Sequence, residues 1–226
     1  RYFGQFLESK EGQAYLGQLK ADCESIEREG RKNDAPSKSM KDFVKRDDKK
    51  SNESFKQSDK EAVAIVFHVN RSAETDNLGY AVYIHDMEPL AFADSLGIDQ
   101  GTSASLTDED GNENTYSLFN NEEVQSPIAI KSFDLWSYGQ SAYIPSVRQL
   151  SFLFSVRYQI NECINQVGGT PINLNPGECW LWSSTEVEGQ KENKAWLYSM
   201  QSGTIQETPK DQPHKSRPVI SIYTTK

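Results

Sequence analysis

Three cysteines are the first residues whose chemistry can be judged from their spacing. Cys163 and Cys179 lie sixteen positions apart, one in a predicted helix and one entering a predicted strand, and Cys23 lies far upstream. In a secreted protein Cys163 and Cys179 can pair as a disulfide. The alternative, which we favour, is three small buried hydrophobic residues. The chain has no Cys-x-x-Cys, and the apolar neighbours of Cys163 disfavour a reactive thiolate, so we expect neither a zinc site nor a cysteine nucleophile.

The histidines are too few and too scattered to predict a metal site. They are His68, His85 and His214, and the first two fall in neighbouring strands of a predicted hairpin, where they could approach each other. A metal ion needs three or four converging ligands, and only Asp86 stands beside this pair. We therefore expect His68 and His85 to be one exposed and one half-buried strand residue.

An acidic segment, 108–114, has oxygen-bearing residues at alternate positions. Asp108, Asp110, Asn112 and Asn114 resemble the start of a calcium loop, in which alternate ligands face one side of a tight turn. The glycine stands at the fourth position instead of the sixth, and Phe119 occupies the twelfth, where a glutamate is required. The sequence favours a hairpin turn at Asp110–Gly111 and leaves calcium binding open.

Patterns for other catalysis are missing from the sequence. There is no Ser-His-Asp order, phosphate-binding loop or dinucleotide fingerprint, and Gly168–Gly169 lacks the lysine of a phosphate loop. Acidic pairs occur, but none lies in apolar surroundings that would favour acid catalysis. We therefore expect no enzyme activity, no catalytic residue, no resident metal and no cofactor.

Charge and composition divide the chain into two parts near Lys60. The 226 residues carry 24 basic and 33 acidic side chains, but residues 1–60 hold 14 basic and 12 acidic, against 10 and 21 in 61–226. This acidic balance argues against nucleic acid as a partner, and no apolar run is long enough to span a membrane. The segment 1–60 predicts an amphipathic helix ending near Gly30, followed by a charged linker.

The part from 61 to 226 predicts one α+β domain. A β-branched run at 62–69 and a second at 78–85 flank a polar turn and predict a hairpin. A short helix is expected within 126–137, and the clearest helix runs from Ser146 to Val167, where Gly168–Gly169 ends it. Short strands follow at 179–185, 195–200 and 218–223. Strands, then helices, then strands indicate α+β and not a parallel βαβ array.

Several short motifs stand in an order that resembles a known family. They are Tyr143-Ile-Pro-Ser146 with Gln149-Leu150, Gly168-Gly169, Trp182-Ser-Ser-Thr-Glu186, Ala195-Trp196, Gly203 and Arg217-Pro-Val219. Upstream, Ile65-Val-Phe67, Gly79, Asp110-Gly111 and Asn114-Thr115 fit the same order. This set is similar to the bacterial major-paralogous-domain family, a branch of the C-type lectin-like fold. That fold is related to the formylglycine-generating enzyme fold and to the C-terminal domain of a collagen-like adhesin.

The resemblance implies two helices packed on short antiparallel sheets, with the N- and C-terminal strands paired. It also implies a secreted or surface-anchored bacterial protein. It covers most of 61–226 and none of 1–60. Ala142 and Ile144 depart from the family's usual aromatic and leucine, and the Glu-Pro-Asn and Trp-Asn-Asp triplets of calcium-dependent lectins are missing. The resemblance therefore does not imply calcium-dependent sugar binding.

Four residues of these motifs are expected to be structural. Trp182 and Trp196 are expected to pack in the domain, although aromatic rings can also stack on sugars. Arg217 is expected to be a buried cation paired with Glu186, and breaking such a pair would be strongly destabilising.

Recognition is expected in two polar loops, 188–194 and 201–216, because loops on a rigid scaffold commonly carry binding residues. The candidate ligand contacts in these loops and on the strand between them are Glu188, Gln190, Lys191, Asn193, Lys194, Tyr198, Gln201, Gln206, Lys210 and His214. We expect an adhesin-like, non-catalytic protein outside the cell that binds a glycan or a protein. The N-terminal helix is expected to be an ordinary packed helix, and self-association through this helix is the alternative. The alternatives are a subunit of a surface assembly or variable display scaffold and, less favoured, an enzyme related to the formylglycine-generating fold.

Overall fold

In the computed structural model, which describes residues 62–70, 77–137 and 140–223, the chain is mixed α+β and all its strand pairs are antiparallel. Ala62–Tyr223 forms one compact unit. The helix and linker predicted for 1–60, together with Cys23, lie outside the described residues. No helix in the described part is both long and apolar enough to cross a membrane.

The predicted N-terminal hairpin is confirmed. Strand β1 (Ala64–Val69) pairs with β2 (Asn77–Tyr83), and the last strand, β10 (Val219–Tyr223), pairs with the other edge of β2. The resemblance implied that the first and last strands pair with each other. In the structure they do not, because β2 lies between them. A register shift between Val66 and His68 marks a bulge in β1. The bulge lets Phe67 and His68 both contact Tyr80, which lies opposite on β2.

The helix predicted for 146–167 is two helices in the structure. Helix α6 (Val147–Ser155) begins at Ser146, which forms a capping box with Gln149. The backbone leaves helical geometry at Val156, where φ is −118°, and α7 (Arg157–Gln166) follows. Because apolar residues continue at helical spacing across this break, the sequence pattern does not reveal it.

The hairpin turn predicted at Asp110–Gly111 is wrong, because this pair begins a helix. Asp110 caps α4 (Gly111–Phe119) by accepting a 3.0 Å hydrogen bond from the backbone N–H of Glu113. A Cβ at Gly111 would lie 2.6 Å from the carbonyl oxygen of Ile144, so this glycine allows close packing of the helix start. Helix α5 (Pro127–Phe133) begins at Ser126 and matches the expected short helix. Four helices are thus described, where the resemblance implied two.

The second three-stranded sheet contains β6 (Trp180–Glu186), β7 (Lys194–Ser199) and β8 (Ile205–Pro209), in that order. The segment 201–216, predicted to be a loop, therefore supplies a strand of this sheet. It also supplies β9 (Pro213–His214), which pairs with β3 (Leu90–Ala91). A short pair, β4 (Trp136–Ser137) and β5 (Gln140–Ser141), lies between α5 and α6 in the chain order. Strand β8 has too few apolar residues to predict a strand from its alternation.

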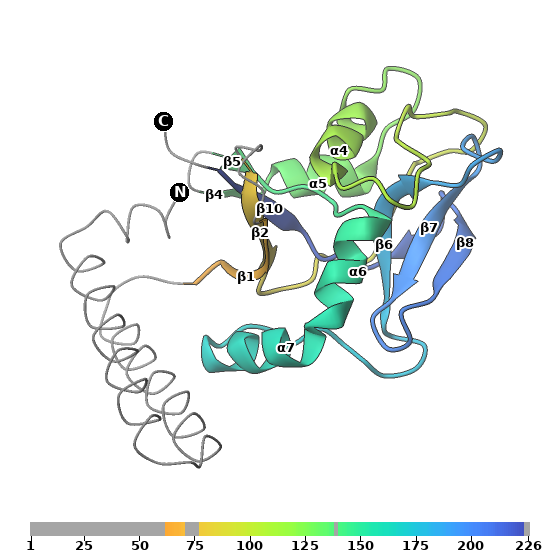
Figure 1. Cartoon of the computed structure of the whole chain (residues 1–226). Coiled ribbons are helices and arrows are strands. Elements are labelled where there is room, and N and C mark those ends of the chain that lie inside the picture. Colours follow the sequence, from red (N-terminus) through yellow and green to blue (C-terminus); the bar gives the residue numbers. More distant parts are fainter. Residues whose placement is uncertain (1–61, 71–76, 138–139, 224–226) are drawn as a thin grey trace, which may run out of the picture. The chain divides into compact units, whose positions relative to one another are not determined.

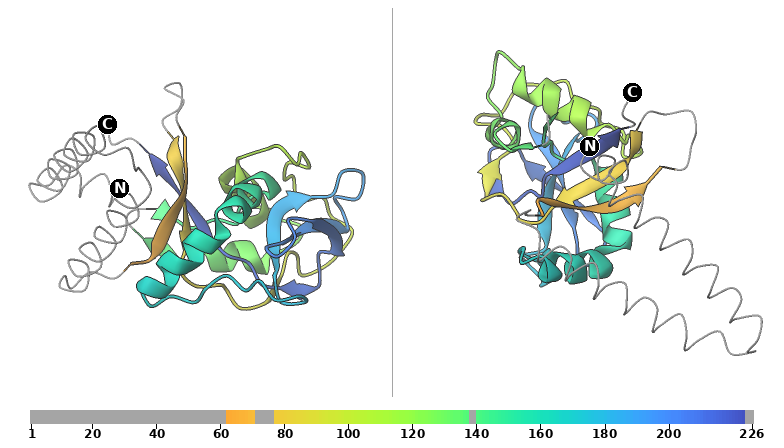
Figure 2. Two further views of the ribbon diagram at one scale, coloured as in Figure 1. Left: turned by 60° about the horizontal axis from the view of Figure 1, so that its bottom comes forward. Right: turned by 90° about the vertical axis from the view of Figure 1, so that its left-hand side faces the viewer.

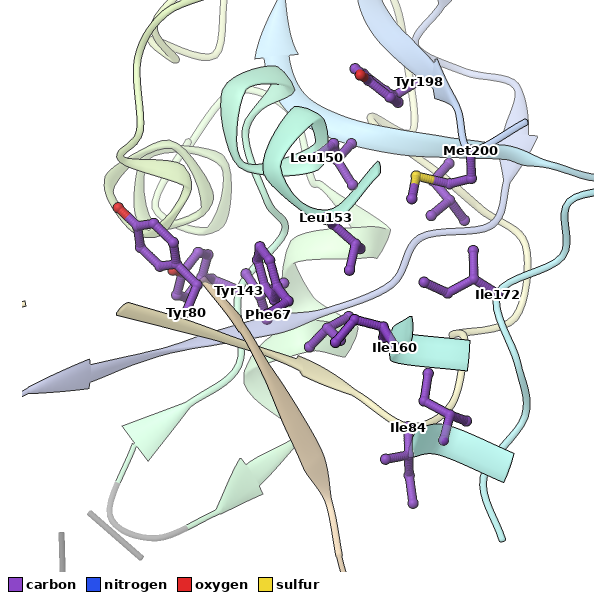
Figure 3. Close-up of a cluster of buried hydrophobic side chains, with 14 of the residues drawn as sticks. Phe67, Tyr80, Ile84, Tyr143, Leu150, Leu153, Ile160, Ile172, Tyr198 and Met200 are labelled. Carbon is purple, nitrogen blue, oxygen red and sulfur yellow. The ribbon is translucent and has the colours of Figure 1, made fainter. Parts of the chain in front are cut away.

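Helix α6 lies between the two larger sheets, with α4 and α5 on one side and α7 on the other (Figure 1). The two further views show α7 close to β1 (Figure 2). Leu150 and Leu153 of α6 are fully buried in the main hydrophobic core. They meet Tyr198 and Met200 from the β7 side and Ile172 from the loop after α7 (Figure 3). This loop is therefore anchored in the core although it begins at the surface.

Candidate functional site

The motif residues that carry the family resemblance are structural in this protein. Trp182 is fully buried, and its indole N–H donates to the carbonyl of Leu90 at 3.1 Å. The Tyr143 hydroxyl lies 2.8 Å from the Ser221 hydroxyl, and burial raises the pKa of Tyr143. Trp196 is half-buried and packs against the main core, in agreement with the structural role expected for it. These side chains therefore hold the strands and loops in place and are not themselves candidate ligand contacts.

The predicted ion pair between Arg217 and Glu186 is wrong, because each has a different partner. The buried carboxylate of Glu186 accepts from the Lys210 ammonium at 2.8 Å and from the backbone N–H groups of Gln100 and Thr102. Lys210 also donates to the carbonyl of Ile98 at 2.7 Å, and both charged side chains are fully buried. The pair therefore fixes the loop 98–102 against the second sheet.

Arg217 joins three separate segments from inside the domain. Its fully buried guanidinium donates to the Asp86 carboxylate, to the carbonyl of Tyr83 at 3.2 Å and to the carbonyl of Thr170 at 2.7 Å. Tyr83 ends β2, Asp86 follows it, and Thr170 lies in the loop after α7. A fixed fork of donors suits this role, because guanidinium N–H groups point in several set directions.

An open pocket of about 390 Å³ lies beside this buried arginine. Its lining comes from Asp86, from Lys215 and from the loop 170–175. Of that loop, Thr170, Asn173 and Asn175 offer polar groups, whereas Pro171, Ile172 and Leu174 are apolar. The size lies within the usual range for small-molecule sites.

The loop that forms most of the pocket is held at several points. The Asn161 side chain of α7 accepts from the N–H of Ile172 at 2.7 Å and donates to the carbonyl of Ile172 at 2.8 Å. The N–H of Thr170 donates to the carbonyl of Ile84 at 2.8 Å, and the N–H of Asn175 donates to the Asn173 side chain at 2.9 Å. Because side chains and backbone already fix the loop, the pocket is largely preformed, which lowers the entropic cost of binding.

Gly169 allows the loop to approach β2, and we expect its substitution to disturb the pocket. A Cβ at this position would lie 2.7 Å from the Ile84 carbonyl oxygen and 2.8 Å from Ile164 Cγ2. Gly169→Ala is expected to lower the free energy of unfolding by about 1–3 kcal/mol, as overpacking does. Urea denaturation measures this loss. Gly101→Ala is the matched control, since its Cβ meets nothing within 4 Å and only its φ of +78° opposes the change. A loss below about 1 kcal/mol in Gly169→Ala would contradict the close approach, whatever the strained φ costs the Gly101 variant.

The pocket can bind a ligand that offers both hydroxyl groups and apolar C–H surface. The Asp86 carboxylate accepts hydrogen bonds, the Lys215 ammonium donates them, and the asparagine side chains do both. The negative charge of Asp86 is paired with Arg217. Among the described residues that line the pocket, the Lys215 ammonium is the one cation, and it has no carboxylate paired with it there, so it can meet a negative group of the ligand. A ligand with an acidic group beside its hydroxyl groups therefore fits the lining best.

Two of the predicted ligand contacts are inside the protein. Lys210 is fully buried in its ion pair, and Tyr198 is 4% exposed in the core, so neither side chain is available at the surface. The polar residues of 201–216 predict a loop and an exposed Lys210, whereas this segment carries two strands. Tyr198 lies on β7 and packs in the main core. His214 is half-buried edge-on against Trp182, with ring centroids 5.3 Å apart, and burial lowers the pKa of His214 from 6.5.

The other predicted ligand contacts surround the hairpins of the second sheet. Gln190 and Lys194 both donate to the Glu207 carboxylate, at 3.3 and 3.0 Å, and Lys191 forms a 2.9 Å ion pair with Asp99. The remaining four are exposed: Glu188, Asn193, Gln201 and Gln206. None of the ten lines the pocket. The sequence signal that could have indicated the pocket is the polar, Asn- and Pro-containing segment 170–178 after the helix stop.

The remaining residues with chemical potential are held in structural contacts. Cys163 and Cys179 do not bond to each other, and Cys179 is buried beside the Ser199 hydroxyl. His68 stacks on Phe152 at 4.1 Å, whereas His85 lies 2.9 Å from the Thr170 hydroxyl, so the two histidines do not meet. As expected, one histidine, His68, is a half-buried strand residue and the other, His85, is exposed, but His85 lies beyond the end of β2 and not in the strand.

The acidic segment 108–114 is arranged around the start of α4. Asp110 caps the helix, and the Asn114 side chain points inward, where it accepts from the N–H of Ser103 at 2.8 Å. Over the residues that the structure describes, no three His, Cys, Asp or Glu side chains are grouped closely enough to hold a metal ion. The alternate spacing in the sequence therefore does not place these oxygens around one point.

No protein-family model matches the chain, and no curated protein matches it.

Proposed function

We propose that this protein is a non-catalytic, glycan-binding protein displayed or secreted by a bacterium, and that its domain has the C-type lectin-like fold. The observation that carries the proposed function is the preformed pocket between Asp86, Lys215 and the loop 170–175. Three segments far apart in the sequence meet there, and the buried Arg217 fixes two of them. A buried cation that holds two sides of a pocket in place supports a role of that pocket in binding.

The proposed fold is supported by what the motif residues do. Ser146 caps α6, Trp182 fills the second core, and Arg217 connects the strand before the pocket to the loop after α7. The small antiparallel sheets and the four helices agree with the mixed α+β character of that fold. The proposal differs from a calcium-dependent lectin, because it assigns recognition to side chains and not to a bound ion.

A glycan is favoured over a protein as the pocket's ligand because of size and lining. Asparagine and carboxylate side chains can hydrogen-bond neighbouring hydroxyl groups of one sugar ring, and the apolar Ile172 and Leu174 can contact its C–H surface. A protein ligand would instead bury a larger area around aromatic anchors. The Lys215 ammonium favours a sugar that carries a carboxylate or a sulfate.

The test is binding of the labelled 226-residue chain to a broad glycan array, with calcium and again with a chelator. We expect selective binding to acidic glycans that the chelator leaves unchanged. Binding that disappears in chelator would overturn the assignment to this pocket and require a metal site. A blank array in both conditions would contradict glycan recognition and favour a protein ligand or a role in a surface assembly.

A further inference from the structure

Helices α4 and α5 share a second surface with recognition chemistry. Tyr116 is 56% exposed, Phe119 46% and Ile130 39%, and the rings of Phe119 and Phe133 lie 4.5 Å apart. The two helices lie next to each other (Figure 1). The four side chains therefore form one apolar patch, which we call the α4–α5 patch.

The core does not require these four side chains to be apolar. The buried side of α4 is supplied by Thr115 and Leu118, and that of α5 by Ile128 and Ala129. The patch residues stand three apart on each helix, Tyr116 and Phe119 on α4 and Ile130 and Phe133 on α5, so each pair shares an outward side of its helix. Grouped aromatic rings on a surface are typical of protein–protein interaction sites.

The charge around the α4–α5 patch is strongly negative. The segment 108–134 contains seven acidic residues, and Lys131 is its only basic residue. Five of the acidic side chains are exposed: Asp110, Glu113, Glu122, Glu123 and Asp134. An acidic rim repels nucleic acids and anionic membrane surfaces and attracts basic polypeptides, since complementary charge speeds and orients association.

We propose that the α4–α5 patch binds a basic polypeptide segment of a partner protein, in which aromatic or aliphatic side chains alternate with lysine or arginine. The apolar side chains of that segment contact Tyr116, Phe119, Ile130 and Phe133, and its cations face Glu113, Glu122 and Glu123. None of these residues lines the glycan pocket, so this interaction is independent of the proposed function.

Three labelled peptides test this inference on the 226-residue chain. One alternates lysine with phenylalanine and leucine, the second has serine in place of the apolar residues, and the third has glutamate in place of lysine. We expect only the first to bind, with an affinity that falls as salt increases. Replacing Tyr116 and Phe119 together by serine is expected to weaken binding by about tenfold or more. Replacing Glu122 and Glu123 together by lysine is expected to do the same.

Tyr158→Ser is the matched control, because this tyrosine is 59% exposed on α7, away from the patch residues in the sequence. Binding to this variant should equal that of the unchanged protein. Equal binding of the lysine–serine peptide, or unchanged binding by the Glu122 and Glu123 variant, would overturn the inference. Glu122 and Glu123 are exposed and lie in the segment that connects α4 to α5, so their substitution is compatible with folding. This variant therefore tests the inference even if the aromatic variant fails to fold. Absence of binding by the first peptide would overturn it as well.

Discussion

Arg217→Met is expected to lower the free energy of unfolding by about 3–5 kcal/mol, because it leaves the Asp86 carboxylate without its buried cation. It also removes the donors to the carbonyls of Tyr83 and Thr170. Since Thr170 and Asp86 both line the pocket, ligand binding should be lost together with stability. Urea denaturation measures the first effect, and titration with the ligand at low temperature measures the second.

Arg148→Met is the matched control for this variant. Arg148 forms an ion pair at 3.7 Å with Glu109, and both side chains are more than two-fifths exposed. An exposed pair of this kind contributes about 0–1 kcal/mol. A loss in Arg217→Met that is no larger than the loss in Arg148→Met would contradict the role assigned to Arg217.

Lys210→Met is expected to have a comparable effect, a loss of about 3–5 kcal/mol, because the Glu186 carboxylate would remain buried without its cation. The backbone N–H groups of Gln100 and Thr102 would still donate to that carboxylate. Adding Glu186→Gln to Lys210→Met removes both charges. The loss of unfolding free energy in the double variant should therefore be smaller than the sum of the losses in Lys210→Met and Glu186→Gln, by about 1–3 kcal/mol.

The same measurement distinguishes the observed pairs from the pair expected from sequence. Arg217 and Glu186 share no hydrogen-bond partner, so Arg217→Met and Glu186→Gln should be additive within about 0.5 kcal/mol. Strong coupling between these two changes, or additivity of Lys210→Met with Glu186→Gln, would show that the ion pairs are assigned wrongly. Thermal or urea unfolding of the five variants is sufficient.

Local signals in the sequence predicted those elements that depend on local interactions. The β-branched run at 62–69 contains β1 (Ala64–Val69), and Ser146 with Gln149 begins α6. A strand pattern and a capping box require only neighbouring residues. The turn predicted at Asp110–Gly111 is wrong because the same two residue types suit a turn and a helix start. Only the close approach of Gly111 to Ile144, which is far along the chain, distinguishes them.

The candidate site was less predictable, since its geometry depends on long-range contacts. Lys210 and Arg217 are both basic residues in a polar stretch of the sequence, and the sequence does not show which carboxylate each one pairs with. The pocket combines Asp86, Lys215 and a loop near position 172, which come together only when β2, α7 and the segment before β10 are assembled. Polarity of a segment indicated exposure correctly for Glu188 and Gln201 but not for Lys210, which is buried.

The most direct test of the proposed function is calorimetric titration of an acidic glycan selected by the array into three proteins. These are the unchanged protein, Lys215→Ala in the pocket, and Lys194→Ala on the second sheet, where Lys194 contacts Glu207 instead. We expect Lys215→Ala to weaken binding by about tenfold or more, as loss of a charged hydrogen bond does, and Lys194→Ala to leave it unchanged. Unchanged binding by Lys215→Ala, with loss in Lys194→Ala, would contradict the pocket and place recognition on the hairpin surface of β7 and β8.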